Sequence, residues 1–108
     1  EIYPLSLHDA LPIFCDRAFI PATIVRHGDD DAGTVLVKIN RFEQGVTVYA
    51  PATSLGSEPM WSRGTGPKPV SEAEADAYIE RQVKYDPDIW VLEIEDRKGQ
   101  YKLDGKIV

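Results

Sequence analysis

The sequence predicts a small α+β domain: an antiparallel sheet of about four to six strands, mostly a meander, with one main helix packed on one face. Two observations lead to this prediction. Short segments rich in β-branched and aromatic residues alternate with turns that contain glycine, proline or aspartate, which is typical of strands. One segment, 72–85, instead repeats its apolar residues at helical spacing.

Strands are expected at 22–26, 34–40, 46–50, 60–63 and 89–95, with a further edge strand at 101–103 and a frayed end at 106–108. The turn 27–33 has glycine near both ends, which favours an antiparallel hairpin between the first two strands. In the strand 89–95, Trp90 and its apolar alternates point to the core. Glu93 and Glu95 leave the opposite face at least partly wet.

The helix is expected to begin after Ser71 and to end before Pro87. Ser71 and Glu74 have the spacing of a capping box, in which each side chain satisfies a free backbone N–H. The residue before a proline disfavours helical angles, so Pro87 stops the helix. Its apolar stripe consists of Ala75, Tyr78, Ile79 and Val83. We expect this stripe to cover the sheet face that carries Val35, Val37, Trp90 and Leu92.

The first thirteen residues, EIYPLSLHDALPI, resemble the in-frame translation of a common sequencing adapter, from which they differ only at Pro4. This resemblance implies that the sequence comes from assembled environmental or draft genomic DNA and that its native N-terminus is missing. We therefore divide the chain into an adapter-derived segment, 1–13, and a single α+β domain, 14–108. On this division His8 and Asp9 carry no functional meaning.

Charge and composition narrow the class of partner. The chain has 18 acidic and 12 basic side chains, a formal charge of -6. Removing Glu1 and Asp9 leaves 16 acidic side chains and a charge of -4, so we expect no nucleic-acid partner. No apolar run approaches the roughly 18 residues of a membrane span, so we expect a soluble protein. The single Cys15 forms no internal disulfide and is compatible with the cytoplasmic location that we expect.

Three segments resemble a known family. They are GDDDAGTVLVKINRF at 28–42, VYAPA at 48–52 and KYDPDIWVLEIEDRKG at 84–99. In the same order they resemble short alphaproteobacterial proteins grouped as domain of unknown function 1491, and the resemblance spans 17–103. It implies an alphaproteobacterial cytoplasmic protein of this size, and it supplies no activity, cofactor or catalytic residue. The chain departs from the family at its N-terminus, where family members have an apolar, tryptophan-containing opening.

The candidate binding residues are Met60, Trp61 and Arg63. They lie next to a segment of glycine and proline that breaks regular structure, which favours exposure. Tryptophan and arginine are favoured contact residues at protein interfaces. The alternative is an edge strand that covers the core.

A second set of residues suits metal-dependent chemistry. His27 adjoins the acidic run 29–31, and the densest group of carboxylates consists of Asp86, Asp88, Glu93, Glu95 and Asp96. Glu93 and Glu95 are about 7 Å apart on one strand face, a spacing that suits two carboxylates sharing a water or a metal. The alternatives are a hairpin tip at 29–31, turn formers around Pro87, and a solvated strand face.

The leading hypothesis is therefore a non-catalytic module that binds another protein, with no catalytic residue, metal or cofactor assigned. The alternative is a small metal-dependent hydrolase that uses His27 with Glu93, Glu95 or Asp96. That alternative requires the histidine and the carboxylates to converge in one concave site.

Overall fold

The structure is a computed structural model that describes residues 20, 22–31, 33–52, 59–99, 101–103 and 106–107. The segment 1–13, expected to be adapter-derived, lies outside the described residues, as does Cys15. Among the described residues, no helix combines the length and the apolar character needed to cross a bilayer.

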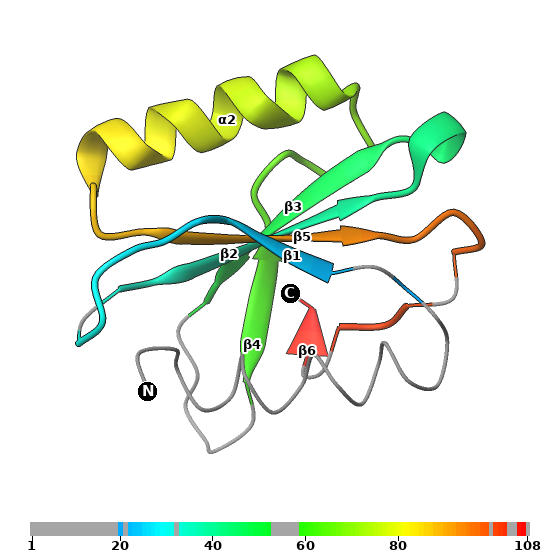
Figure 1. Cartoon of the computed structure of the whole chain (residues 1–108). Helices are drawn as coiled ribbons and strands as arrows, with labels where there is room; N and C mark the ends of the chain where they lie inside the picture. The colour runs from blue at the N-terminus through cyan, green and yellow to red at the C-terminus, as the bar shows by residue number, and fades with distance from the viewer. Residues whose placement is uncertain are drawn as a thin grey trace.

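The α+β class is confirmed: one sheet carries one main helix on one face (Figure 1). The elements in chain order are β1 (Ala22–Arg26), β2 (Val35–Asn40), η1 (Phe42–Gln44), β3 (Val46–Pro51), β4 (Met60–Arg63), α2 (Glu72–Tyr85), β5 (Trp90–Glu95) and β6 (Lys106–Ile107). In Figure 1, α2 runs along the upper side of the sheet, and β4 and β6 lie in the lower half with their arrows pointing upward, steeply inclined to the other strands. The strands therefore fan through a strong twist, as sheets of L-residues do.

The sheet is mixed, and its order differs from a simple meander. Six strands lie in the order β1-β5-β2-β3-β4-β6. Antiparallel neighbours that follow one another in sequence occur at β2–β3 and β3–β4, so the meander is confirmed for these three strands. The pairs β2–β5 and β4–β6 are parallel. The expected β1–β2 hairpin is wrong, because β5 lies between these two strands and pairs with both.

The burial of β5 explains its central place. Val91 is 1% exposed on one face, and the opposite face carries buried Trp90, Leu92 and Ile94. The face with Glu93 and Glu95 was expected to be at least partly wet; Glu95 is exposed, whereas the Glu93 side chain is only 16% exposed. It is held by Lys38 and Asn40 of β2 under the cover of α2. A strand that is covered on both faces belongs inside a sheet rather than at its edge.

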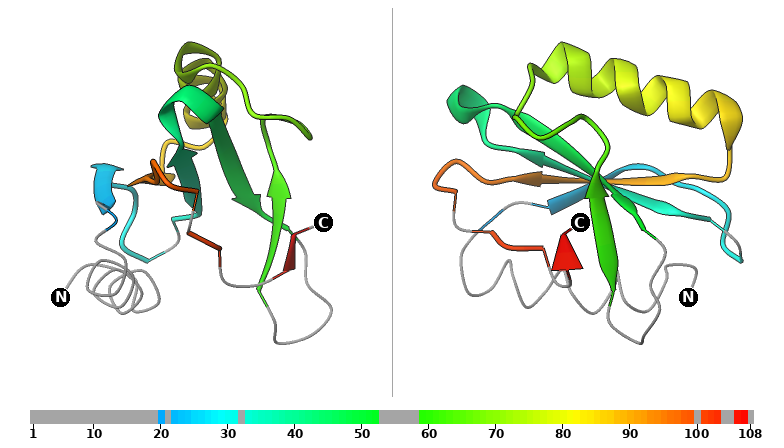
Figure 2. Two further views of the ribbon diagram at one scale, coloured as in Figure 1. Left: turned by 90° about the vertical axis from the view of Figure 1, so that its right-hand side faces the viewer. Right: turned by 180° about the vertical axis from the view of Figure 1, so that it is seen from behind.

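Two apolar clusters fill the two faces of the sheet. One consists of Ile20, Val37, Ile39, Tyr49, Trp90, Leu92, Ile94 and Tyr101. The other consists of Leu36, Val46, Val48, Ala75, Ile89 and Val91, with Tyr78 and Ile79 of α2 packed against it. The helix therefore covers the Leu36–Val91 face, and the expectation that it covers the Val37–Trp90 face is wrong. Figure 2 shows α2 confined to one side of the sheet.

The ends of α2 follow its sequence signals. Ser71 is the N-cap, and its hydroxyl oxygen accepts a hydrogen bond from the backbone N–H of Glu74 at 3.1 Å. Val70, just before the cap, packs in the same cluster as Ala75, which is a hydrophobic staple. The Glu74 carboxylate accepts from the Ser71 hydroxyl at 3.4 Å, so of the two predicted capping-box bonds the structure shows the one to the Glu74 N–H. The helix ends at Tyr85, one residue before the Asp–Pro pair, so the predicted bounds are confirmed.

The expected edge strand at 101–103 is not a strand; the last strand is β6. The backbone of Tyr101 is committed elsewhere. Its N–H donates to Asp96 Oδ2 and its carbonyl accepts from Arg41 Nη2, both at 3.0 Å. Side chains thus form the hydrogen bonds that the backbone N–H and carbonyl of Tyr101 would otherwise make to a neighbouring strand.

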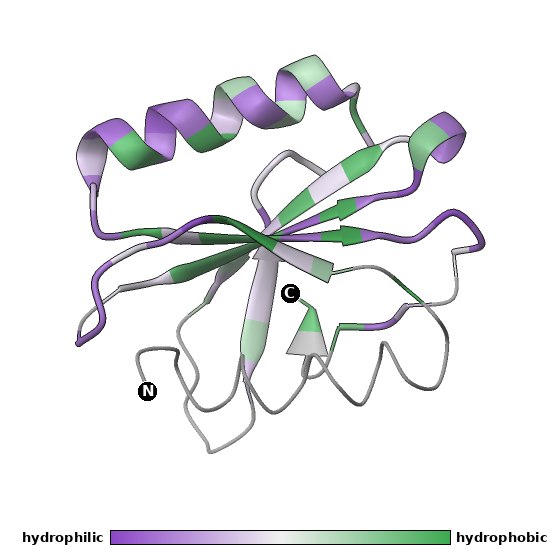
Figure 3. Ribbon diagram, in the orientation of Figure 1, coloured by the Kyte–Doolittle hydropathy of each residue, from purple (hydrophilic) through white to green (hydrophobic). Residues whose placement is uncertain are grey.

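Trp90 anchors the loop between β1 and β2. It is fully buried, and its indole N–H donates to the Asp29 carbonyl at 2.8 Å. A Cβ added at Gly28 or Gly33 would lie within 2.6 Å of the indole Cδ1, so only glycine permits this approach. The loop itself is hydrophilic, as is the turn after β5, whereas the central strands are largely hydrophobic (Figure 3).

Candidate binding site

A pocket of about 250 Å³ lies on the sheet face opposite α2. Its apolar lining consists of Ile39, Leu103 and Ile107, and its polar lining consists of Arg41, Tyr49, Arg63, Tyr101 and Lys102. Tyr49 and Arg63 are directly opposed across β3 and β4, so the antiparallel register places both side chains on one face. The pocket therefore combines three basic side chains with two tyrosines and an apolar wall.

The charge of Arg41 is neutralised within the protein. Its Nε donates to Asp96 Oδ2 at 3.0 Å, and its Nη2 donates to the Tyr101 carbonyl. Asp96 is 1% exposed, so this ion pair is shielded from water on the side of the acid. The pair fixes the turn after β5 against the turn after β2 and brings Arg41 to the pocket wall already balanced.

Arg63 and Lys102 are exposed, and among the residues that the structure describes neither has a carboxylate within salt-bridge distance. With Arg41 balanced, the described residues that line the pocket carry an excess of two positive charges. This excess stands out on a chain whose formal charge is -6. The pocket is therefore a local cationic site on an acidic protein.

The three residues predicted to bind have different positions. Arg63 lines the pocket, whereas Met60 and Trp61, which belong to the same strand, are half-buried and do not line it. Trp61 packs against the Val37–Trp90 cluster and pairs with Ile107 of β6. The large hydrophobics that are most exposed among the described residues lie elsewhere: Val25 at 51% and Tyr85 at 88%.

Sequence reasoning missed Arg41, Tyr49, Tyr101 and Lys102. These residues come from β3 and from two turns, and each is ordinary in its own sequence context. One signal was available: a basic residue immediately follows the expected second strand, and another lies near the end of the chain. The face that they share depends on strand pairing, which the sequence pattern does not encode.

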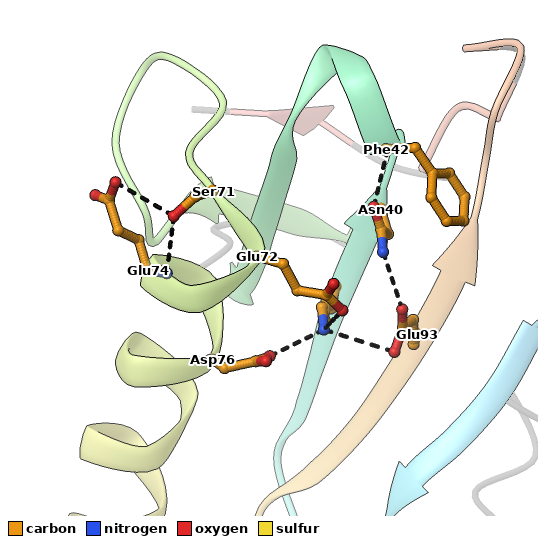
Figure 4. A network of polar contacts seen from close by, with 8 residues as sticks. Asn40, Phe42, Ser71, Glu72, Glu74, Asp76 and Glu93 are labelled. Carbon is orange, nitrogen blue, oxygen red and sulfur yellow. Dashed lines mark hydrogen bonds and ion pairs between the residues drawn. The ribbon is translucent and has the colours of Figure 1, made fainter.

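A polar network joins the sheet to α2 on the opposite face (Figure 4). Lys38 Nζ is 2.9 Å from Glu72 Oε2 and from Asp76 Oδ1, and 3.6 Å from Glu93 Oε1. Asn40 donates to Glu93 Oε2 at 3.3 Å and accepts from a backbone N–H at 2.9 Å. The network explains how Lys38, only 4% exposed, is tolerated as a buried charge.

Burial on its own would lower the pKa of Lys38. Hydrogen bonds to Asp76 and Glu72 and the charge of Glu93 outweigh burial, so the pKa of Lys38 is raised above its ordinary value. The lysine therefore stays protonated and holds three carboxylates. It acts as a structural cation rather than as a base or a nucleophile, roles that need a lowered pKa.

The structure does not assemble the hydrolase site. His27 packs against Trp90, with ring centroids 4.1 Å apart, and its Nε2 is 3.6 Å from Asp30. Glu93 projects from the opposite face of β5, where it contacts Lys38. Asp96 lies at the far end of β5, about 20 Å along the strand from Trp90. His27 and these carboxylates therefore belong to separate places in the fold.

Two of the remaining acidic residues, Asp29 and Asp86, form turns with their side chains. Asp29 Oδ2 accepts from the Asp31 N–H at 3.0 Å, and Asp86 Oδ1 accepts from the Asp88 N–H at 3.1 Å. Both are side-chain turns that span two residues. Within the described ranges, no group of three or more histidine, cysteine or acidic side chains is arranged to hold a metal.

The fold and the site define a small mixed-sheet α+β domain with one covering helix and a cationic pocket. The family model described as "Protein of unknown function (DUF1491)" matches residues 9–104. The chain belongs to this DUF1491 family, as the resemblance implied. The match includes five residues of the segment 1–13. A comparison with curated proteins finds no match.

Solved structures of the same family have the same fold. A crystal structure of a DUF1491 family protein from Caulobacter crescentus CB15 is 34% identical, with a TM-score of 0.75 over 100% of this chain and 99% of that one. An NMR structure of a DUF1491 family protein from the same organism is also 34% identical, with a TM-score of 0.74 over 100% and 98%. A solution structure of a protein from A. tumefaciens, 24% identical over 87% and 85%, has a TM-score of 0.69 and supports the fold alone.

Proposed function

We propose that this protein is a non-catalytic interaction module that binds another protein through the surface formed by Met60, Trp61 and Arg63. One observation carries the proposal: Arg63 is an exposed cation with no acidic partner among the described residues, at the rim of a concave pocket. By contrast, Lys38 of β2 and Arg41, which follows β2, are each paired with carboxylates. An unbalanced arginine beside a pocket is available to a partner.

The neighbouring residues suit an interface. Arginine and tryptophan are among the residue types that most often dominate binding energy, and they contribute most where surrounding contacts exclude water. β6 pairs with Met60 and Trp61, whereas no described strand pairs with the outer edge of β4 at Ser62 and Arg63. The partner that suits this surface is an acidic segment, because Arg63 and Lys102 both lack a counter-ion among the described residues. A cytoplasmic location, inferred from the lone Cys15, is part of the same proposal.

The test compares two charge reversals of equal size. Arg63→Glu and Lys84→Glu each change the net charge by two units, and Lys84 lies on α2, across the sheet from the pocket. Tagged wild-type protein and both variants are used to capture partners from an alphaproteobacterial lysate, with folding checked by NMR. The dissociation constant of any stoichiometric partner is then measured.

We expect Arg63→Glu to weaken the partner by about 30-fold, which corresponds to about 2 kcal/mol at a hot spot. Lys84→Glu should leave the affinity within about twofold. Equal capture by wild type and Arg63→Glu, or the absence of any stoichiometric partner, would contradict the proposal.

A further inference from the structure

We propose that the pocket lined by Arg63, Lys102 and Tyr49 binds a phosphate monoester group carried on a small apolar or aromatic body. The proposal goes beyond protein binding and does not depend on it, because the pocket residues that carry it all belong to this chain. It rests on the charge, the free donors and the size of the pocket.

The charge of the pocket matches a doubly charged group. Arg41 is balanced by Asp96, so among the described lining residues Arg63 and Lys102 are the cations left to face the ligand. A phosphate monoester carries a charge of about -1.5 to -2 near neutral pH, whereas a carboxylate carries -1 and would leave one cation unbalanced. The planar guanidinium of arginine binds phosphate oxygens in pairs, and lysine adds a point charge.

Tyr49 supplies a neutral donor. The residue is 8% exposed, and its hydroxyl has no hydrogen-bond partner among the described residues. Among the described residues, the fully buried side-chain atoms without a partner do not include this hydroxyl oxygen. The oxygen is therefore accessible, and Tyr49 lines the pocket. A tyrosine held inside a core with its hydroxyl open to a cationic pocket provides a preset hydrogen bond for an oxygen of the ligand.

The wall and the volume of the pocket limit the rest of the ligand. Ile39, Leu103 and Ile107 form an apolar wall that inorganic phosphate would leave unused. The volume of about 250 Å³ is below the roughly 300–1,000 Å³ of pockets for drug-sized ligands. The pocket therefore suits one ring or a short chain. A long nucleic acid is disfavoured by the charge of -6 on the chain.

The experiment is an NMR titration of the folded full chain at about pH 7.5, where a monoester is mostly dianionic. The probes are phenyl phosphate, inorganic phosphate and benzoate, which separate the contributions of the anion and of the ring. We expect saturable shifts around the pocket with phenyl phosphate. Benzoate and inorganic phosphate should each bind at least about tenfold more weakly.

Variants locate the site. Arg63→Met and Lys102→Met should each weaken phenyl phosphate by about tenfold, and Tyr49→Phe by about threefold. Lys98→Met is the matched control, because this cation lies in the turn after β5 but does not line the pocket. It should leave binding within about twofold. Arg63→Lys, which keeps the charge, serves if Arg63→Met does not fold; it should retain part of the affinity.

Lowering the pH to about 5 should weaken phenyl phosphate, because the second ionisation of the monoester is near pH 6. Equal affinity for benzoate and phenyl phosphate, an equal effect of Lys98→Met, or no saturable shift would each overturn the proposal. A blocked phosphotyrosine is the final probe. Binding tighter than that of phenyl phosphate would indicate a phosphorylated protein segment as the source of the group, and weaker binding would indicate a free small molecule. Partner capture plays no part in this titration, so the two proposals fail separately.

Discussion

Replacing Lys38 with methionine removes a buried charge and keeps the length of the side chain. The lysine is 4% exposed and holds Glu72 and Asp76 of α2 as well as Glu93 of β5. Lys38→Met therefore leaves three carboxylates close together without their cation. We expect the variant to fold and to be less stable than the wild type.

The size of the loss follows from exposure. Glu72 and Asp76 have side chains 57% and 54% exposed, so water screens both contacts and each contributes about 0.5 kcal/mol. The Glu93 side chain is 16% exposed and keeps one hydrogen bond from Asn40. Leaving its charge without the lysine therefore costs about 2 kcal/mol. The expected loss is about 3 kcal/mol, which lowers Tm by about 12 °C in a domain of this size.

Chemical denaturation of four proteins measures the effect: wild type, Lys38→Met, Glu93→Gln and the double variant. Neutralising Glu93 removes the stranded charge, so the double variant should be about 1–2 kcal/mol more stable than Lys38→Met alone. A loss below about 1 kcal/mol for Lys38→Met, or strictly additive effects in the cycle, would show that the network does not join α2 to the sheet as described.

The pH dependence gives a second test of the same variant. The pKa of Lys38 is raised in the folded state, so its contribution is fully present below the unfolded value of about 10.4. It is lost as pH rises through the folded pKa. The stability difference between wild type and Lys38→Met should therefore be constant from neutral pH to about pH 10 and should shrink above that.

Three further predictions concern stability. Gly28→Ala should cost at least about 2 kcal/mol in a denaturant titration, because its Cβ would lie 2.1 Å from the Asp88 carbonyl oxygen; a neutral result would mean that the loop does not pack on Trp90. Burial raises the pKa of Tyr78, so the unfolded state ionises first above about pH 10 and stability falls there; Tyr78→Phe should flatten that fall, and an unchanged slope would refute the assignment. Removing residues 1–13 should shift Tm by only a few degrees, equivalent to about 1 kcal/mol, and a collapse of the calorimetric transition would show instead that this segment has been recruited into the core.

Signals that act over a few residues predicted the elements well. The bounds of α2 were predicted because a cap at Ser71 and a stop at Pro87 are local events, decided by hydrogen bonds and sterics within one turn. The strands 22–26 and 60–63 were likewise found at their observed bounds. Local chemistry sets where such elements begin and end, whatever they later pack against.

Strand neighbours were predicted poorly, because pairing depends on residues far apart in the chain. Alternation correctly grouped Trp90 with Leu92, but it did not show that Glu93 is largely covered, since the lysine that contacts it lies on β2. With Glu93 covered, β5 is buried on both faces and becomes a central strand. A single sequence shows the carboxylate but not its distant partner.

The same reason limits prediction of the site. Arg63 was selected from its own surroundings, and it does line the pocket. Tyr49 and Lys102 carry no local mark of function, and they meet Arg63 only after β3, β4 and the segment 101–103 have been placed together. Trp61 was expected to be more exposed than it is, because the cluster that half-buries it comes from other strands.

The position of β5 constrains the order in which the chain can fold. β1 and β2 are close in sequence, yet neither can complete its pairing until β5 has been synthesised. β5 then inserts between them, antiparallel to β1 and parallel to β2. Until then both strands present unpaired edges that invite association with other chains. Such non-local pairing slows folding, and a nascent chain that ends before Trp90 lacks β5, the strand that joins β1 to the rest of the sheet. We therefore expect truncation after α2 to yield aggregated protein rather than a smaller stable domain.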